Sequence, residues 1–212
     1  MNKALALIGG GGHARSVIAA LPGKGNLSGY VDIRPRDDMA LFQSGLKWLG
    51  DDDCFLSKES PDRFEILITL VSGRDCSLDF RRKLIERYAA FSSPVVIAPT
   101  AWVGEGTDLG KGTVVLNHAV VNVNSSVGEH SVVNTGAIVE HDCKIGSNVF
   151  IGPGVVVCGG VEIGNDVYVG AGAVIRPGLR IADGSLVSLG ASVFHNIVKP
   201  GTYLGNPARK IK

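Results

Sequence analysis

The chain repeats itself every six residues over almost half of its length. From Ile97 to Val193, seventeen consecutive positions spaced six apart are Ile, Leu or Val without exception. This period matches neither the roughly 3.6-residue turn of a helix nor the two-residue alternation of a strand. It is typical of a solenoid in which three short strands make one triangular coil, with the aliphatic residue pointing inward. The repeat therefore predicts a parallel β-helical prism of nearly six coils.

The residues before the repeat follow another pattern, in which apolar runs alternate with helical spacing. The runs lie at residues 3–8, 27–32 and 63–71, and the helical patterns at 13–21 and 77–90. Such alternation predicts a small parallel sheet covered by helices. The expected fold class is therefore α/β plus β. A Rossmann-like parallel α/β domain at 1–93 would precede a β-helix domain at 94–212, whose tail caps the last coil.

Several side chains outside the aliphatic column are expected to have structural roles. In the second helical pattern, Arg81, Arg82 and Lys83 are expected on the solvated face, with contact to the nucleotide as the alternative. Trp48 and Trp102 are expected to be packing residues.

Charge and hydropathy exclude several classes of partner. The net charge is +1, so electrostatics give no reason to expect nucleic acid or an acidic membrane surface. No stretch reaches the roughly 18 apolar residues that span a bilayer, and the first apolar run leads into glycines rather than a cleavage site. We therefore expect a cytoplasmic protein with neither nucleic-acid nor membrane partners.

A glycine-rich loop follows the first predicted strand. Gly9 to Gly12 open the first helix, and Asp32 ends the next strand. This is close to the dinucleotide fingerprint, in which a helix N-terminus receives a phosphate. Because fewer than a hundred residues precede the repeat, the phosphate or ribose of a nucleotide sugar is a better fit than a dinucleotide. The expected contacts are Gly11, Gly12, His13 and Asp32; the alternative is a glycine-rich turn with a structural His13.

Three segments resemble one family. They are Leu7 to Ala14 (LIGGGGHA), Asn134 to Cys143 (NTGAIVEHDC) and Gly205 to Ala208 (GNPA). Together with the hexads they resemble the NeuD/PglD/PerB-type sugar acetyltransferases of the hexapeptide-repeat, left-handed β-helix superfamily, over essentially the whole chain. The resemblance implies a homotrimer, acetyl-CoA in the groove between neighbouring prisms, and an acceptor sugar held partly by the α/β domain. The chain departs at Phe150, where some relatives have a second histidine, and at Ile33, where some have a second acidic residue.

His141 is the candidate general base. It lies outside the aliphatic column, so its ring should project from the prism. Acyl transfer from a thioester needs a group that takes the proton of the attacking amine or hydroxyl, and histidine titrates near neutrality. Asp142 or Glu140 could orient the ring; the resemblance gives the catalytic role to His141 and the acidic-partner position to Asp142. The alternative is a corner histidine that makes a turn hydrogen bond.

The remaining site residues follow from the resemblance and from position along the prism. A backbone N–H near Gly159 would stabilise the oxyanion. The other expected contacts are Ala171, Gly172, Gly190 and Arg209 for acetyl-CoA, with Lys210 beside Arg209, and Asn117 and His118 for the substrate. Each of these residues has a structural alternative, either a tight corner or a solvated tail.

The sequence therefore predicts an acetyl-CoA-dependent N-acetyltransferase that acts on the amino group of a nucleotide-linked amino sugar, with a role in polysaccharide biosynthesis among the compatible ones. The nearest alternative is O-acetylation of a sugar hydroxyl, as in a sialic acid. More distant ones are a nucleotide-binding scaffold and a zinc carbonic anhydrase. No metal is expected, because His118, His130 and His141 stand in mixed phases of the hexad and do not predict a tetrahedral site.

Overall fold

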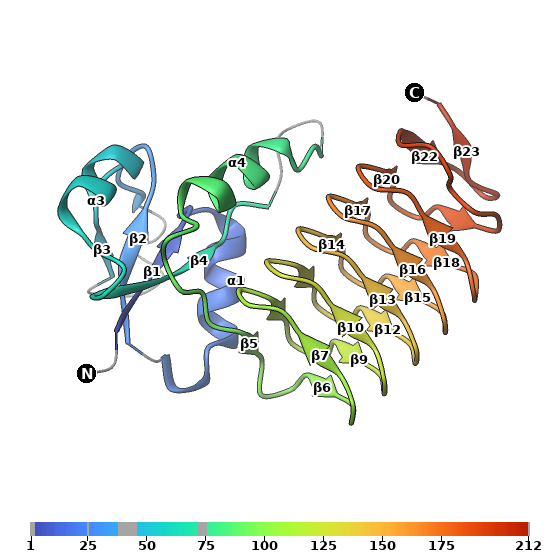
Figure 1. The fold of residues 1–212 in the computed structure, drawn as a ribbon, viewed down its shortest axis with the longest axis horizontal. Coiled ribbons are helices and arrows are strands. Elements are labelled where there is room, and N and C mark those ends of the chain that lie inside the picture. Colours follow the sequence, from blue (N-terminus) through green and yellow to red (C-terminus); the bar gives the residue numbers. More distant parts are fainter. Residues whose placement is uncertain (1–2, 25, 38–45, 72–75, 212) are drawn as a thin grey trace.

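The chain forms two units that lie side by side. The computed structural model describes residues 3–24, 26–37, 46–71 and 76–211. Figure 1 shows a small α/β unit beside the first coils of a prism that extends toward the C-terminus. This confirms the predicted α/β plus β fold class. The division between residues 93 and 94 stays a prediction; the first prism strand is Val96–Ile97.

The α/β unit is built on one parallel sheet in the order β3-β2-β1-β4. Its strands are β1 (Ala4–Ile8), β2 (Leu27–Val31), β3 (Lys47–Trp48) and β4 (Phe64–Ile68). Its helices are α1 (Gly12–Ala20), α3 (Asp52–Lys58) and α4 (Asp79–Arg87), with a 3₁₀ turn at Pro22–Lys24. The sequence patterns predict three of the strands and two of the helices. They miss β3 and α3. Asp51 was a signal for α3, because aspartate is a preferred N-cap residue, and it accepts a hydrogen bond from the Cys54 N–H at 2.8 Å.

The central strand β1 is apolar throughout because both of its faces are buried. Leu5 and Leu7 pack in one cluster with α1 and with the outer face of the first prism coils. Ala6 and Ile8 pack in a second cluster that includes Phe55 of α3 and residues of α4. Helix α1 therefore belongs to the layer between the sheet and the prism.

The prism has three faces, each a parallel sheet in which residue i pairs with residue i+18. The domain face, which carries the α/β unit, contains β5 (Val96–Ile97), β8 (Val114–Val115), β11 (Val132–Val133), β14 (Phe150–Ile151), β17 (Tyr168–Val169) and β20 (Leu186–Val187). The apolar face contains β6 (Trp102–Val103), β9 (Val120–Val121), β12 (Ile138–Val139), β15 (Val156–Val157), β18 (Val174–Ile175) and β21 (Ser192–Val193). The charged face contains β7 (Asp108–Leu109), β10 (Ser126–Val127), β13 (Lys144–Ile145), β16 (Glu162–Ile163) and β19 (Arg180–Ile181).

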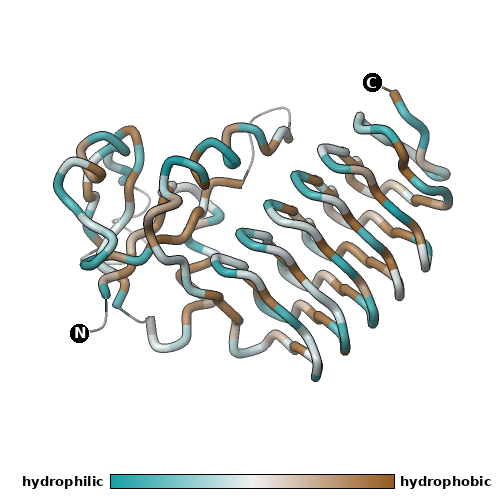
Figure 2. Tube along the Cα trace, in the orientation of Figure 1, coloured by the Kyte–Doolittle hydropathy of each residue, from teal (hydrophilic) through white to brown (hydrophobic). Residues whose placement is uncertain are grey.

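The aliphatic column fills the interior, as predicted, except at its start. Figure 2 shows apolar residues recurring along the successive coils. The hexad residues from Val115 to Val193 are buried, whereas Ile97 is 38% exposed and Val103 and Leu109 are half-buried, because no coil precedes them. At the other end, β22 (Thr202–Leu204) extends the domain face and β23 (Arg209–Lys210) pairs antiparallel with it. The tail therefore lies over the final coil.

Most corners of the prism turn through one residue in the left-handed conformation. From residue 106 to 190, each sixth residue has a φ between +53° and +71°. Nine of these fifteen residues are Gly, and the other six are His118, Asn124, His130, Asp142, Asn148 and Asp166. Gly, Asn, Asp and His are the residues that tolerate this backbone best. The corner position thus explains why polar side chains recur in columns along the edges.

Trp102 is a correction to the expected packing residues. Its side chain is 49% exposed on the apolar face, beside the half-buried Val120 of the next coil. Trp48 is 42% exposed and donates from Nε1 to the Asp32 carbonyl at 2.9 Å. In the described ranges, no helix has the length and apolar character needed to cross a membrane.

Candidate active site

His141 and Asp142 form the corner between the apolar and charged faces, which we call the reaction corner. Both side chains are exposed, at 57% and 60%. Asp142 has a φ of 58°, and its Oδ2 lies 2.8 Å from His141 Nδ1. This hydrogen bond raises the pKa of His141, with smaller contributions from the charges of Asp142 and Glu140. When the ring is neutral, the Nδ1–H can therefore donate a hydrogen bond to the Asp142 carboxylate, and the Nε2 lone pair is then free to accept a proton.

Asp142, rather than Glu140, is the acidic partner of the base. The Glu140 carboxylate is engaged elsewhere, because its Oε2 accepts from Asn122 Nδ2 at 3.0 Å. The structure thus separates the two acidic residues that the sequence left as alternatives.

Gly159 lies directly beside the His141 ring on the next coil. A Cβ on Gly159 would be 2.7 Å from both Nε2 and Cε1 of His141, closer than side-chain carbons approach. Its N–H has no hydrogen-bond acceptor among the described residues, while its carbonyl accepts from Gly178 N at 3.0 Å. One corner therefore carries a base nitrogen and an unpartnered amide donor side by side. Acyl transfer requires both groups: a base that takes the proton of the attacking amine or hydroxyl, and a donor that stabilises the oxyanion of the tetrahedral intermediate.

The other expected prism contacts lie on a different edge, the corner between the domain and apolar faces. Asn117 Oδ1 accepts from Thr100 Oγ1 at 2.9 Å, and the exposed His118 has a φ of 58°. Ala171 is exposed, and a Cβ added to Gly172 or Gly190 would meet nothing within 4 Å. Neighbouring corners of one coil are separated by a strand, because one hexad, at most about 20 Å of extended chain, lies between them. Within one chain these residues therefore lie on a different edge from His141.

The tail cations lie at the far end of the prism. Arg209 donates to the Ala208 carbonyl at 3.2 Å, and Lys210 Nζ donates to the Pro200 carbonyl at 2.8 Å. Both are exposed, and they line a small pocket of about 170 Å³ together with His195.

The glycine-rich loop and Asp32 meet at the carboxyl edge of the α/β sheet. Asp32 Oδ2 accepts from the Gly10 N–H at 2.9 Å, and Oδ1 accepts from the Ile33 N–H at 2.8 Å. Gly11 caps α1 without a side-chain hydrogen bond, and a Cβ there would meet nothing within 4 Å. The start of α1 is thus open to an anion, in keeping with the dipole and free N–H groups of a helix N-terminus.

Gly10 is a residue of this loop that the sequence reasoning missed. A Cβ on Gly10 would lie 2.6 Å and 2.8 Å from carbons of the Tyr30 ring and 3.1 Å from Asp32 Oδ2. Its signal was its place in the run of four glycines, but periodicity cannot say which of the four is packed against the sheet.

His13 points toward the prism. Its ring lies edge-on to Phe150, with ring centroids 6.3 Å apart, and its Nε2 is buried without a partner among the described residues. Burial, together with the charge of Arg81, lowers the pKa of His13 to about 4. His13 is therefore neutral at pH 7 and would not act as a cation toward a phosphate; its contact with substrate stays a prediction.

Arg81 is a correction to the expected solvated helix face. It is 2% exposed, whereas Arg82 and Lys83 are exposed as expected. The signal was present in the helical spacing, because Arg81 lies three residues from both Leu78 and Leu84, which are buried.

The three histidines considered for zinc occupy three different corners. His118 lies between the domain and apolar faces, His141 between the apolar and charged faces, and His130 between the charged and domain faces. Among the described residues, no group of three or more His, Cys, Asp or Glu side chains is placed to hold a metal.

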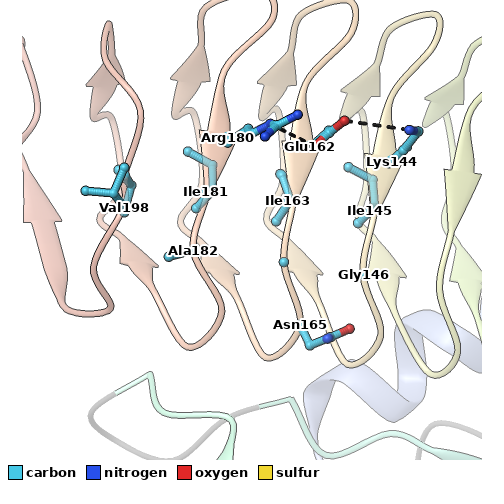
Figure 3. Close-up of a pocket in the computed structure, with 12 residues that line it drawn as sticks. Lys144, Ile145, Gly146, Glu162, Ile163, Asn165, Arg180, Ile181, Ala182 and Val198 are labelled. Carbon is cyan, nitrogen blue, oxygen red and sulfur yellow. Dashed lines mark ion pairs between the residues drawn. The ribbon is translucent and has the colours of Figure 1, made fainter.

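A groove of about 580 Å³ runs over the charged face, which borders the reaction corner. Figure 3 shows Lys144, Glu162 and Arg180 of successive coils along it; Glu162 pairs with Arg180 at 3.0 Å and with Lys144 at 3.6 Å. None of its lining residues is a predicted site residue. Exposed ion pairs of this kind contribute little to folding stability.

The chain is similar to several known proteins. Residues 124–159 and 142–177 match the bacterial transferase hexapeptide (six repeats) family. The acetyltransferase domain of PglB from Neisseria gonorrhoeae FA1090, in complex with acetyl coenzyme A, is 33% identical with a TM-score of 0.87, covering 100% of both chains. PerB from Caulobacter crescentus, in complex with CoA and GDP-perosamine, is 29% identical with a TM-score of 0.83, covering 99% of this chain and 97% of that one.

Three further solved structures are also similar to the chain. The H141N and H141A mutants of the Caulobacter perosamine N-acetyltransferase, with the same two ligands, are each 28% identical to this chain. WeeI from Acinetobacter baumannii AYE, at 22% identity and a TM-score of 0.80, supports the fold alone. No curated protein sequence matches the chain. On these similarities and its hexads, the chain belongs to the NeuD/PglD/PerB-type sugar acetyltransferases of the hexapeptide-repeat, left-handed β-helix superfamily.

Proposed function

We propose that the protein is an acetyl-CoA-dependent N-acetyltransferase that acetylates the amino group of a nucleotide-linked amino sugar. The observation that carries this proposal is the reaction corner, where the His141 ring lies against Gly159, whose N–H has no acceptor among the described residues. The relatives support the substrate classes, since they were solved with acetyl coenzyme A and with CoA and GDP-perosamine. The open N-terminus of α1 and Asp32 supply a place for the nucleotide.

The reaction divides into roles for three residues. The acceptor amine attacks the thioester carbonyl, and His141 Nε2 takes the proton that the amine loses. Asp142 holds the Nδ1 proton and stabilises the imidazolium that forms. The Gly159 N–H donates to the carbonyl oxygen as it gains negative charge. When the carbon–sulfur bond breaks, the CoA thiolate leaves and takes up the proton from His141.

The working unit of this proposal is a homotrimer. In a closed ring, each interface joins one edge of a subunit to the opposite edge of its neighbour. Such a ring brings the reaction corner of one prism to the Ala171, Gly172 and Gly190 corner of the next, which a single chain keeps apart. The apolar face would then point inward. It exposes Trp102 and Val174 and half-exposes Val120, Ile138 and Val156. Acetyl-CoA would lie in the groove between the prisms, with Arg209 near its phosphates.

Acetyl transfer is tested by measuring thiol release from acetyl-CoA against UDP-, GDP- and dTDP-linked amino sugars, with free sialic acid as the hydroxyl acceptor. Turnover with one nucleotide amino sugar and acetylation at nitrogen are expected. Turnover with sialic acid alone would move the protein to O-acetylation. The base is tested separately: the His141→Asn variant should bind acetyl-CoA but have a much lower kcat/KM, whose remaining rise with pH is that of the acceptor amine losing its proton. Wild-type kcat/KM at all pH values in that variant would exclude His141 as the base.

A further inference from the structure

Arg81 joins the α/β unit to the prism through a buried guanidinium. From α4, its Nε donates to the Leu70 carbonyl at 3.0 Å, and its Nη1 donates to the His130 carbonyl at 2.5 Å. The same Nη1 also donates to Asn148 Oδ1. One side chain therefore bonds to the end of β4 and to two successive coils of the prism.

The corner that receives Arg81 carries side chains where the same column elsewhere has glycine. His130, Asn148 and Asp166 hold three successive left-handed positions, and Gly112 and Gly184 hold the positions on either side. Asn148 Nδ2 donates to Asp166 Oδ1 at 2.6 Å, and Asp166 Oδ2 accepts from Arg82 Nη1 at 3.1 Å. The polar side chains of this corner thus coincide with the place where α4 docks.

The other end of the Arg81 contact reaches the glycine-rich loop. Leu70 N lies 3.0 Å from the point that a Cβ on Gly9 would occupy, so the two backbones touch. Thr69 Oγ1 donates to the Gly9 carbonyl at 2.6 Å. Arg81 therefore holds the segment on which the first glycine of the loop rests.

Packing alone does not require an arginine at this place. Leu78, one turn earlier on the chain, packs against Val132 and Phe150 of the same prism face without a polar contact. Among the described residues no carboxylate hydrogen-bonds to Arg81, although the charge of Asp166 acts on it, and its Nη2 has no partner. Burying such a cation is costly, but its hydrogen bonds have directions that an apolar contact lacks. Directional contacts fix the orientation of one unit on the other.

We propose that Arg81 is a positioning residue for the acceptor, which fixes the nucleotide-holding loop relative to the prism so that the amine arrives correctly at a reaction corner. This inference rests on the proposed function. Arg81 touches neither the open amides of the loop nor the reaction corner. We therefore expect it to affect the position of the bound acceptor and not the affinity for it. Because a misplacement of about 1 Å can cost about 100-fold in rate, the effect should appear in kcat.

The test compares Arg81→Met with Lys83→Met, a change at a neighbouring exposed cation of the same helix. Both are assayed with the nucleotide amino sugar that the wild type accepts. For Arg81→Met we expect kcat to fall about 10- to 100-fold. The Kd of the matching nucleoside diphosphate, measured by calorimetry, and the KM of acetyl-CoA should stay within about 3-fold of wild type. Lys83→Met should keep the wild-type kcat.

Three results would overturn the proposal. A wild-type kcat with a lowered Tm would leave Arg81 a stability role only. A rise in the nucleotide Kd that matches the loss of kcat/KM would make it a binding residue. If Arg81→Met does not fold, Asn148→Gly removes one acceptor while suiting the left-handed backbone; kcat should then fall about 3- to 10-fold, and an unchanged kcat would refute the inference. Failure of the proposed function is distinguishable, because the wild type itself would then not turn over.

Discussion

Replacing Gly159 with alanine should displace the base without removing any hydrogen-bond donor. The new Cβ would lie 2.7 Å from His141 Nε2 and Cε1, whereas ordinary van der Waals contact begins near 3.4 Å, so the ring must retreat by about 0.7 Å. Gly159 is not among the residues with positive φ, so the backbone accepts alanine. A displacement of this size at a reacting nitrogen should lower kcat by roughly 10- to 100-fold, with little change in either KM or in Tm.

A double-mutant cycle isolates the ring contact from other effects of the methyl group. In a His141→Asn background the ring is gone, so adding Gly159→Ala should lower the residual rate by no more than about 3-fold. Steady-state kinetics at saturating acetyl-CoA measure both steps. If Gly159→Ala alone keeps kcat within about 3-fold of wild type, or if it lowers kcat equally in both backgrounds, the ring contact does not position the base.

Three further predictions concern the base, the junction and the assembly. Asp142→Asn replaces the carboxylate whose hydrogen bond and charge raise the pKa of His141 with a neutral amide, so the acid limb of the kcat/KM profile should move to lower pH while the plateau falls about 10-fold or more; an unmoved limb would refute the pairing. Burial and the charge of Arg81 lower the pKa of His130 to about 4. Between about pH 6.5 and 4, His130 therefore binds a proton in the unfolded chain but not in the folded one, so acidification destabilises the fold. At pH 5 this costs about 2 kcal/mol; His130→Asn, which suits the corner, should reduce the drop in unfolding free energy between pH 7 and 5 by that amount, as urea titrations would show. Ile138→Glu on the apolar face should give monomers by light scattering and abolish turnover, and an active monomer would exclude a site shared between copies.

The prism could be predicted from the sequence because its energetics are local and periodic. Each coil contacts only its neighbours, so one aliphatic residue in six and one corner residue in six suffice to specify it. The exception at Ile97 is also local, since a first coil has no predecessor to cover it. The two elements that were missed, β3 and α3, are short, and their patterns fall below what periodicity detects.

The reaction corner was only partly predictable. His141 stands between Glu140 and Asp142 in the chain, so an acidic partner follows from sequence although its identity does not. Gly159 meets the ring only because it lies one coil of eighteen residues further on. Arg81 shows the converse. Its charge predicts solvent, yet the helix turns it toward a corner whose acceptors are 49 and 67 residues away. Composition records what a side chain prefers, not what another part of the chain will place against it.

The sequence by itself determines the hexad prism, the glycine-rich loop before α1 and the adjacent base and acid, because each depends on residues close together in the chain. Only the tertiary structure decided that Asp142 rather than Glu140 hydrogen-bonds to His141, that the His13 ring lies against Phe150, and that Ala171, Gly172 and Gly190 lie on another edge from the base. Those outcomes depend on which coil stacks on which and where α4 docks, and such long-range contacts are set by the sum of packing over the whole chain.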